Sequence, residues 1–399
     1  MQGSLIICTK NRAQQLKRCL EYVDGASKPK RLVEIVIVDN NSSDETKSVV
    51  EEHQKKSRFA TKYIKCEKAG LGSARNSGVH GSVGEWLIFT DDDCYIEEEF
   101  FINFFRSITE TNLHLPSPST ENVLYGSGQI LPCDTEDDSR ISALTIEKVT
   151  IMLPFTVISP GTVQGANMFF HRSIFEKIGG FNERMGAGTP FPCEDIEMAA
   201  RASLAGYFGA QVPDFKVVHH HKRKTSSFAA VSLIEGYDYG RGAYYADLLA
   251  RGTPQAWDFW GESIKESRFD SASRLKLARE LYGASKYLEF EPDDLNKPPQ
   301  KQIRDLKTTV RALTEERDGL RGQLTTLVEQ HASAHAEALA ERDGLLAERD
   351  GLKGTLAERD AQVTSLNQAV AALRASTSWR ITAPLRRAAR LLRHRKGPE

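Results

Sequence analysis

Three short apolar segments in the first hundred residues constrain the fold more than any other feature. They are Ser4–Thr9, Glu34–Val38 and Glu85–Thr90, and continuous apolar runs of this length are typical of parallel strands buried on both faces. Amphipathic patterns separate and follow them, and these predict helices over 13–23, 43–55 and 71–80. Strands that alternate with helices predict an α/β domain with a mostly parallel central sheet.

Polar residues follow each of the three predicted strands. Thr9 and Asn11 come at the end of the first strand, Asp39 at the end of the second, and Asp91–Asp93 at the end of the third. In open α/β sheets, ligands bind in the crevice outside the carboxyl ends of the strands. We therefore expect these side chains to converge on one ligand site, with Thr9, Asn11, Asp39 and Asp91 on its nucleotide side.

The aspartate triplet is the strongest indication of a metal site. Hard cations such as Mg²⁺ and Mn²⁺ take carboxylate oxygens and can bridge to substrate phosphates. In an extended segment Asp91 and Asp93 point to the same side, so this pair is the predicted ligand set and Asp92 is left unassigned. The alternative is an acidic loop that caps a helix before Glu97–Glu99.

Two further segments in the first half each have a functional and a structural interpretation. Asp39 with Asn40–Ser42 could bind a nucleobase or ribose, but these residue types also favour turns and helix caps. Gly70–Asn76 predicts a glycine turn into a helix, where free amides and Arg75 could reach a diphosphate. Such turns also occur without any ligand.

Two polar segments in the second half complete the candidate site. Glu194 and Asp195 follow the glycine-containing loop 186–193 and begin a helix, so they could serve as a general base or simply cap the helix. His219–His221 follow a predicted strand, and strand alternation sends His219 and His221 to one side and His220 to the other. They could supply a metal ligand, or form a solvated strand end before the basic residues 222–224.

Composition limits the classes of partner. The 399 residues carry a formal net charge of −1, which disfavours nucleic acid as the main partner. Neither a signal peptide nor an apolar run of about 20 residues is present, and the six cysteines form no C-x-x-C pair. We expect a cytoplasmic protein with reduced cysteines that is either soluble or peripheral on the inner face of the membrane.

Changes in composition divide the chain into four regions. A catalytic domain over 1–225 is followed by an aromatic-rich helical extension over 226–295, a coiled coil over 300–375 and a basic amphipathic tail over 376–399. The coiled coil is predicted from apolar residues at 3-4 spacing, which are Ile303, Leu306, Val310, Leu313, Leu320, Leu324 and Leu327. It would form a homo-oligomer or hold a partner enzyme. Residues 379–396 could lie on an anionic membrane, or be a solvated basic tail.

Together and in this order, these segments resemble the family 2 glycosyltransferases, which have the GT-A nucleotide-sugar fold. The resemblance covers about residues 4–221, and it is carried by 6–12, 36–44, 70–76, 85–93, 165–167, 179–181 and 194–195. It implies that Asp39 contacts the base of the donor and Arg75 its phosphate region. It also implies that Asp91 holds the ribose and metal side of the nucleotide, that Asp93 binds the metal, and that His219 lies near the metal and diphosphate.

The same resemblance implies a reaction. Asp195 would be the catalytic base, Glu194 would orient the base or the acceptor, and the sugar would be transferred with inversion in a single displacement. A divalent metal, Mn²⁺ or Mg²⁺, would stabilise the departing nucleoside diphosphate. The acceptor would be a saccharide or a lipid-linked saccharide in surface polysaccharide synthesis. Two alternatives remain at this stage, a sugar nucleotidyltransferase and a coiled-coil scaffold with an inactive transferase domain.

Overall fold

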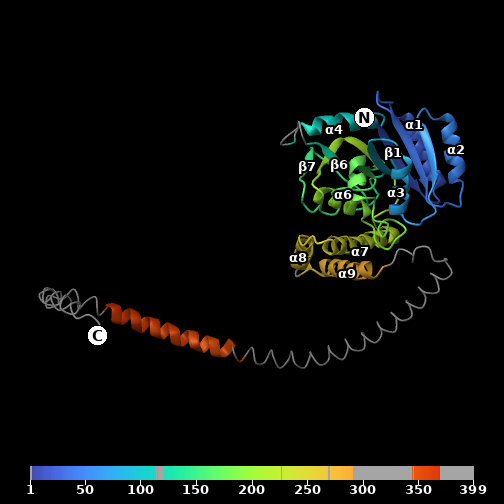
Figure 1. Cartoon of the computed structure of the whole chain (residues 1–399). Helices are drawn as coiled ribbons and strands as arrows, with labels where there is room; N and C mark the ends of the chain where they lie inside the picture. Colours follow the sequence, from blue (N-terminus) through green and yellow to red (C-terminus); the bar gives the residue numbers. More distant parts are fainter. Residues whose placement is uncertain are drawn as a thin grey trace, which may run out of the picture. The chain divides into compact units, whose positions relative to one another are not determined.

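A computed structural model describes residues 2–113, 115, 121–225, 227–267, 270–290, 344 and 346–368 of the chain. It divides into two compact units, and the boundary falls between residues 298 and 299. Every helix and strand labelled in Figure 1 belongs to the first unit, which contains the sheet. The second unit is described on its own below.

The first unit is built around one mixed sheet, in the order β3-β2-β1-β4-β8-β6-β9-β5 with β7 beside β9. Its strands are β1 Gly3–Thr9, β2 Val33–Asp39, β3 Ala60–Lys65, β4 Trp86–Asp91, β5 Cys94–Ile96, β6 Val123–Pro132, β7 Thr150–Met152, β8 Asn167–His171 and β9 Phe208–His219. The four strands from β3 to β4 are all parallel; three of them, β1, β2 and β4, are the strands that the sequence predicts, and β3 is an additional one. Beyond β4 the sheet is mixed, because β8 runs antiparallel to both of its neighbours.

The helices of this unit are α1 Ala13–Gly25, α2 Thr46–Lys56, α3 Leu71–Gly81, α4 Phe100–Asn112, α5 Arg172–Ile178, α6 Glu194–Leu204, α7 Phe228–Ala250, α8 Ala256–Ser267 and α9 Ser271–Glu289. α2 begins three residues later than the sequence pattern predicts. Asp44 accounts for the difference, since its carboxylate accepts hydrogen bonds from the backbone N–H groups of Thr46 and Ala13. It thereby ties the start of α2 to the start of α1.

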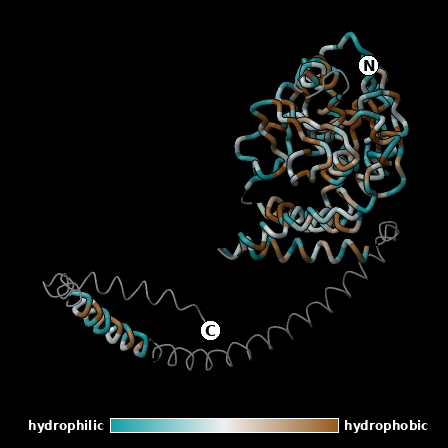
Figure 2. The backbone as a smooth tube through the Cα atoms, turned by 60° about the vertical axis from the view of Figure 1, so that its left-hand side comes forward, coloured by the Kyte–Doolittle hydropathy of each residue, from teal (hydrophilic) through white to brown (hydrophobic). Residues whose placement is uncertain are grey.

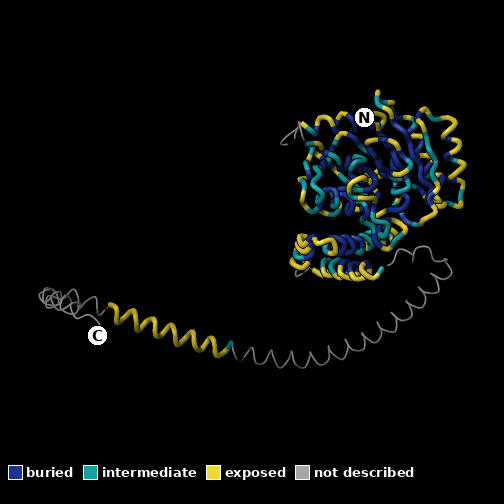
Figure 3. The backbone as a smooth tube through the Cα atoms, in the orientation of Figure 1, coloured by how far each residue is buried: buried dark blue, intermediate teal, exposed yellow. Residues whose placement is uncertain are grey.

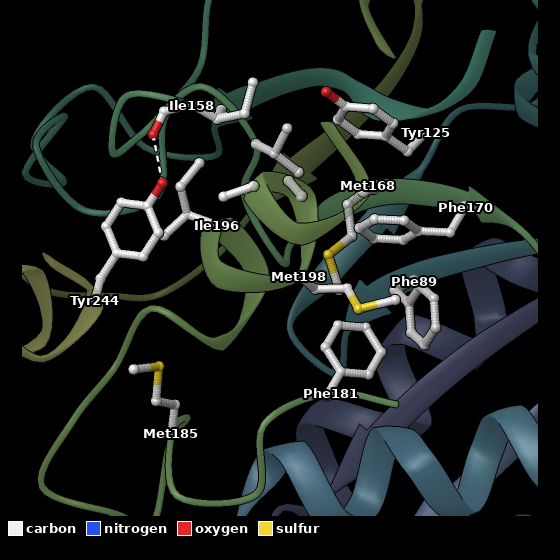
Figure 4. Close-up of a cluster of buried hydrophobic side chains, with 14 of the residues drawn as sticks. Phe89, Tyr125, Ile158, Met168, Phe170, Phe181, Met185, Ile196, Met198 and Tyr244 are labelled. Carbon is white, nitrogen blue, oxygen red and sulfur yellow. Dashed lines mark hydrogen bonds between the residues drawn. The ribbon is translucent and has the colours of Figure 1, made fainter. Parts of the chain in front are cut away.

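Two hydrophobic cores lie on the two faces of the sheet. Side chains of α1, α2 and α4 fill one core, and those of α3, α5 and α6 fill the other. Figure 4 shows the second core, in which Phe89, Phe170 and Phe181 meet edge to face. Figures 2 and 3 show the apolar, buried strands enclosed by helices whose outer faces are polar and exposed. Burial on both faces explains why the central residues of β1, β2 and β4 are apolar.

Helices α7, α8 and α9 form a further layer beside α6 (Figure 1). α7 and α9 pack closely at two glycines: a Cβ atom at Gly242 would lie 1.8 Å from the carbonyl oxygen of Glu280, and one at Gly283 would lie 2.3 Å from that of Tyr239. At the sheet side, the Tyr244 hydroxyl donates a hydrogen bond to the Ile158 carbonyl (Figure 4). These helices fall where the sequence predicts a helical extension, and the domain boundaries themselves stay predictions.

The second unit contains one described helical stretch, over residues 346–368. Leu346 is half-buried, and the apolar side chains of Leu352, Leu356, Val363 and Leu366 are exposed. Most of the predicted coiled coil, and all of the predicted basic tail over 376–399, lie outside the described residues, so both stay predictions. Within the described ranges, no helix combines the length and the apolarity that a membrane crossing requires.

Candidate active site

A cavity of about 380 Å³ opens at the carboxyl ends of β1 and β4, within the size range of small-molecule sites. Thr9, Asp91, Asp93 and His219 line it, as the sequence predicts. The other lining residues are Cys8, Lys10, Arg12, Asn40, Ala69, Gly70, Leu71, Ala74, Asp92, Ile141, Ser142, Ala187, Gly188, Arg223, Leu233 and Tyr237. The cavity therefore joins the strand ends to the glycine turn before α3 and to the first half of α7.

Asp91, Asp93 and His219 form a group that could hold a metal ion. Their side-chain ligand atoms and Cys94 Sγ all lie within 4.8 Å of one another. Antiparallel pairing of β5 with β9 sets Cys94 opposite His219, which brings the histidine to the triplet from 126 residues away in the chain. Two carboxylates and one imidazole suit Mn²⁺ or Mg²⁺, whereas burial raises the pKa of the Cys94 thiol, which therefore stays protonated and is a poor ligand for a hard cation.

Hydrogen bonds orient the imidazole and the second carboxylate of this group. The Nε2 atom of His219 lies 3.3 Å from Asp93 Oδ1, and its Nδ1 atom lies 3.3 Å from the Ser142 carbonyl oxygen, to which it can donate. Burial would raise the pKa of Asp93, but His219 and Arg12 hold it well below its usual range. Burial lowers the pKa of His219, but Asp93 more than offsets this and the pKa is raised overall.

The other two histidines are arranged as strand alternation predicts. The ring of His221 lies 5.0 Å from that of His219, on the same side of the chain. His220 points the other way, where its Nδ1 atom is 2.8 Å from the Tyr95 hydroxyl. Only His219 of the three belongs to the candidate metal group among the described residues.

Asp92, which the sequence leaves unassigned, faces away from the metal group and fixes the end of β1. Its Oδ2 atom accepts a 2.6 Å hydrogen bond from the Thr9 hydroxyl, and its Oδ1 atom lies 3.1 Å from Arg12 Nε. Burial raises the pKa of Asp92 to about 7, although Arg12 and Thr9 oppose this. Thr9 is thus held by Asp92 as well as lining the cavity.

Arg75 does not line the cavity, and its expected contact with a diphosphate stays a prediction. Its side chain is 3% exposed and forms ion pairs with Glu194 and, at 3.7 Å, with Asp91. A Cβ atom at Gly165 would lie 2.2 Å from the Arg75 guanidinium, so the glycine makes room for it. Desolvation would lower the pKa of Arg75, but the surrounding acids raise it. Arg75 is therefore a buried link between the triplet and the acidic pair.

Glu194 and Asp195 begin α6, and neither lines the cavity, although the loop before them supplies Ala187 and Gly188 to its wall. Glu194 is buried, whereas Asp195 is half-buried. The Asp195 carboxylate accepts hydrogen bonds from the backbone N–H groups of Gly165 at 2.7 Å and Ile196 at 2.8 Å. Burial, together with the charge of Glu194, raises the pKa of Asp195 to about 6, against the opposing effect of Arg75. A carboxylate with this pKa can take up a proton near neutral pH.

Asp39 and Asn11 lie outside the cavity wall and bond to neighbouring loops. Asp39 is buried, and its carboxylate accepts hydrogen bonds from the Ser42 backbone N–H and the Tyr63 hydroxyl, each at 2.7 Å. Asn11 accepts a hydrogen bond from the Ser43 backbone N–H, which joins the loops after β1 and β2. Their predicted contacts with the donor therefore stay predictions.

Four residues of the cavity wall carry chemistry but have no role of their own in the prediction from the sequence: Lys10, Arg12, Arg223 and Tyr237. Lys10 and Arg12 belong to the polar end of the first predicted strand, beside the residues predicted to bind the donor, and this position is the signal that could identify them. The sequence places Arg223 only in a basic segment after the histidines, and Tyr237 only in the aromatic-rich helical extension. Neither position indicates that α7 brings Tyr237 to the cavity from far away in the chain.

Comparisons with known proteins indicate the family of the first part of the chain. Residues 4–179 match the family model described as Glycosyl transferase family 2. The chain is 26% identical over 210 residues to Glycosyltransferase AglE of Haloferax volcanii, and the match covers 51% of this chain and 62% of AglE. It is 30% identical over 99 residues to the poly(ribitol-phosphate) beta-N-acetylglucosaminyltransferase TarS of Staphylococcus aureus, covering 25% of this chain and 17% of TarS.

A search of solved structures gives a match to the mannosyltransferase PcManGT from Pyrobaculum calidifontis in complex with GDP-Man and Mn²⁺, with 17% identity and a TM-score of 0.47 over 72% of this chain and 86% of that one. The chain spans less than two thirds of the length of AglE and of TarS. The mixed α/β sheet confirms the predicted fold class. Residues 4–179 of this chain therefore form a family 2 glycosyltransferase domain.

Proposed function

We propose that this chain is a metal-dependent inverting glycosyltransferase, which moves a sugar from a nucleoside-diphosphate sugar to a glycan or a lipid-linked glycan. One observation supports this most strongly. Asp91, Asp93 and His219 meet on the wall of a cavity large enough for a nucleotide, and Arg75 links Asp91 to Glu194, which stands next to Asp195 at the start of α6. A site for transfer to a hydroxyl group needs both a charge to hold the diphosphate and a base.

Asp91, Asp93 and His219 would hold a divalent cation, Mn²⁺ or Mg²⁺, at the carboxyl end of β4. When bound, the cation would stabilise the negative charge that develops on the departing nucleoside diphosphate. Thr9 and Asp91 would position the nucleotide, and Asn11 and Asp39 would order the loops beside it. The donor set of two carboxylates and one imidazole suits such a cation.

Asp195 would accept the proton of the attacking hydroxyl group. Its pKa of about 6 leaves it largely ionised at neutral pH and still basic enough to take up a proton. A base that acts on the acceptor, without a covalent intermediate, gives a single displacement and inversion. Glu194 would orient the site through Arg75 rather than take up the proton itself, because its carboxylate is already paired with that arginine.

The relatives suggest the class of acceptor. TarS is described as acting on poly(ribitol-phosphate), and PcManGT is described in complex with GDP-Man and Mn²⁺. By analogy, we propose a role in surface polysaccharide synthesis, with residues 1–225 as the catalytic domain and 226–295 as its helical extension. The protein would act in the cytoplasm, assembled through a coiled coil over 300–375 and in contact with the membrane through 379–396.

A donor panel tests this proposal. UDP-, GDP-, TDP- and CMP-sugars are incubated with the full chain, with and without Mn²⁺, and release of the nucleotide is measured together with transfer to saccharide acceptors. We expect one nucleotide class to react, and only with metal present. Activity with nucleoside triphosphates and release of pyrophosphate would instead identify a nucleotidyltransferase. Failure of any nucleoside diphosphate to raise the melting temperature with Mn²⁺ would support an inactive scaffold.

A further inference from the structure

Arg12 contacts one of the two Asp93 carboxylate oxygens, which the proposed metal would use as a ligand. Its Nη2 atom lies 2.5 Å from Asp93 Oδ2, while the other oxygen of that carboxylate faces His219. A guanidinium and a divalent cation that both lie beside one carboxylate repel each other. Each therefore weakens the interaction of the other with the shared oxygen atom. A cation that binds beside Asp93 therefore competes with Arg12.

The aspartate triplet does not satisfy every hydrogen-bond donor of Arg12. Its Nε atom lies 3.1 Å from Asp92 Oδ1 but makes no well-directed hydrogen bond. The side chain is 36% exposed on the cavity wall and so has free space beside it. Arg75 offers the contrast, because it is 3% exposed and is confined by Gly165. Of the two arginines that neutralise the triplet, Arg12 is the one with room to leave it.

A nucleoside diphosphate in the cavity would give Arg12 a new partner. The guanidinium fork pairs well with phosphate oxygens, in a geometry that lysine does not reproduce. Lys10 and Arg223 also line the cavity, so its wall already carries positive charge that favours an anion. An Arg12 side chain that turns from Asp93 to the diphosphate would free the carboxylate oxygen for the metal.

We propose that Arg12 couples metal binding to nucleotide binding, by neutralising Asp93 in the empty site and moving to the diphosphate when the nucleotide enters. This inference rests on the proposed function, since it assumes that Asp93 binds a metal. Linkage makes the effect reciprocal: nucleotide raises the affinity for metal by the same factor as metal raises the affinity for nucleotide. Part of that factor comes from Arg12.

Binding of Mn²⁺ to the full chain, measured by calorimetry with and without UDP or GDP, tests the coupling without any activity assay. In Arg12→Gln we expect Mn²⁺ alone to bind about fivefold more tightly or better, at the lower end of typical couplings between sites. Nucleotide alone should bind that variant more weakly, and the enhancement of Mn²⁺ binding by nucleotide should shrink.

Two matched variants control for charge and folding. Lys10→Gln removes a positive charge from the same wall, but Lys10 forms no ion pair with any described residue, so Mn²⁺ alone should bind that variant within about twofold of the wild type. Arg12→Lys keeps the charge, and should keep the weak binding of Mn²⁺ seen without nucleotide while losing part of the binding of nucleotide. Melting temperatures verify that each variant is folded.

The outcomes separate this inference from the proposed function. Equal or weaker binding of Mn²⁺ to Arg12→Gln, in a wild-type protein that does bind Mn²⁺ with nucleotide, would overturn the coupling role and leave the metal site standing. A wild-type protein that binds no Mn²⁺ with either nucleotide would overturn the metal site, and this inference with it. If Lys10→Gln bound Mn²⁺ as tightly as Arg12→Gln does, the effect would come from the lost positive charge in general, and the coupling role of Arg12 would also be overturned.

Discussion

The two acidic regions of the site differ in how each is neutralised. The triplet at the end of β4 faces a cavity, and its partner Arg12 is partly exposed and open to exchange. In the acidic pair at the start of α6, Glu194 is buried and Asp195 is half-buried, and their partner Arg75 is enclosed beside Gly165. The triplet can exchange its contact with Arg12 for a bound ligand, whereas the acidic pair keeps its contact with Arg75. The first is therefore suited to binding, and the second to holding a base in place.

The difference also appears between one carboxylate of each region, although burial raises the pKa of Asp91 and Asp92, the other two members of the triplet. Asp93 has a pKa well below its usual range, because His219 and Arg12 outweigh the effect of burial. Asp195 has a raised pKa of about 6, because burial and Glu194 outweigh Arg75. A permanently ionised carboxylate is what a metal requires, and a carboxylate that can take up a proton is what a base requires. The predictions below test whether this division of roles holds.

The largest effect is expected for Asp93→Ala. It removes a proposed metal ligand, and Lewis-acid stabilisation is worth several kcal/mol, so kcat/KM should fall by about 10⁴-fold or more. Binding of Mn²⁺ measured by calorimetry should be lost with it. Asp92→Asn is the matched control, since Asp92 faces Thr9 and Arg12, and Mn²⁺ should still bind that variant. Loss of Mn²⁺ binding in Asp92→Asn but not in Asp93→Ala would reverse the assignment.

Asp195→Asn should separate the base from the binding site. Removal of a general base typically costs 10²- to 10⁴-fold, so we expect kcat to fall by about 10³-fold. The affinity for nucleotide and Mn²⁺ should stay within about twofold of the wild type, because Asp195 does not line the cavity. A variant that lost binding and kept kcat would place Asp195 on the donor side of the site instead.

Arg75→Met should act on stability, since the arginine is buried between two acids. Removal of one partner from a buried ion pair leaves an unpaired charge and typically lowers the free energy of unfolding by about 3–5 kcal/mol. Urea denaturation measures this change. Gly165→Ala should destabilise the same contact by crowding it. An unchanged free energy of unfolding, together with a weaker binding of UDP or GDP, would restore the role of Arg75 as a diphosphate contact.

A smaller effect is expected from pH. The base must be ionised to accept a proton, so kcat at saturating Mn²⁺ and donor should be constant above about pH 7 and should fall about tenfold per pH unit below the pKa of about 6. Stopped assays between pH 5 and pH 8 measure this. A profile that stays flat down to pH 5 would contradict the assignment of the base to Asp195.

The sequence predicts the parallel half of the sheet better than the mixed half. The central residues of β1, β2 and β4 are apolar because these strands are buried on both faces, and polar residues at or just after the strand ends line the cavity. The sequence does not predict β3. It is an edge strand whose residues are exposed or half-buried, so it lacks the continuous apolar run of the other three strands. No pattern in the sequence predicts the reversed direction of β8, because it depends on pairing between distant segments.

The same limit applies to the site. The residue types and their order identify Asp91, Asp93 and His219 as candidate ligands, and all three meet in one group. The direction in which a side chain points depends on its neighbours, and those come from elsewhere in the chain. Arg75 turns inward because Gly165 leaves room for it, and Asp39 is bound by Tyr63 from the unpredicted strand β3. Neither contact could be foreseen from local sequence.

The most direct test of the metal site is the melting temperature of the wild type and of Asp93→Ala, each with UDP, GDP, TDP or CMP and with or without Mn²⁺. We predict that one nucleotide stabilises the wild type only when Mn²⁺ is present, since a ligand that binds the native state raises its stability. The same nucleotide with Mn²⁺ should leave the melting temperature of Asp93→Ala unchanged. Equal stabilisation of both proteins, or stabilisation that does not depend on Mn²⁺, would contradict the proposal that the cavity at the end of β4 binds a nucleotide through a metal.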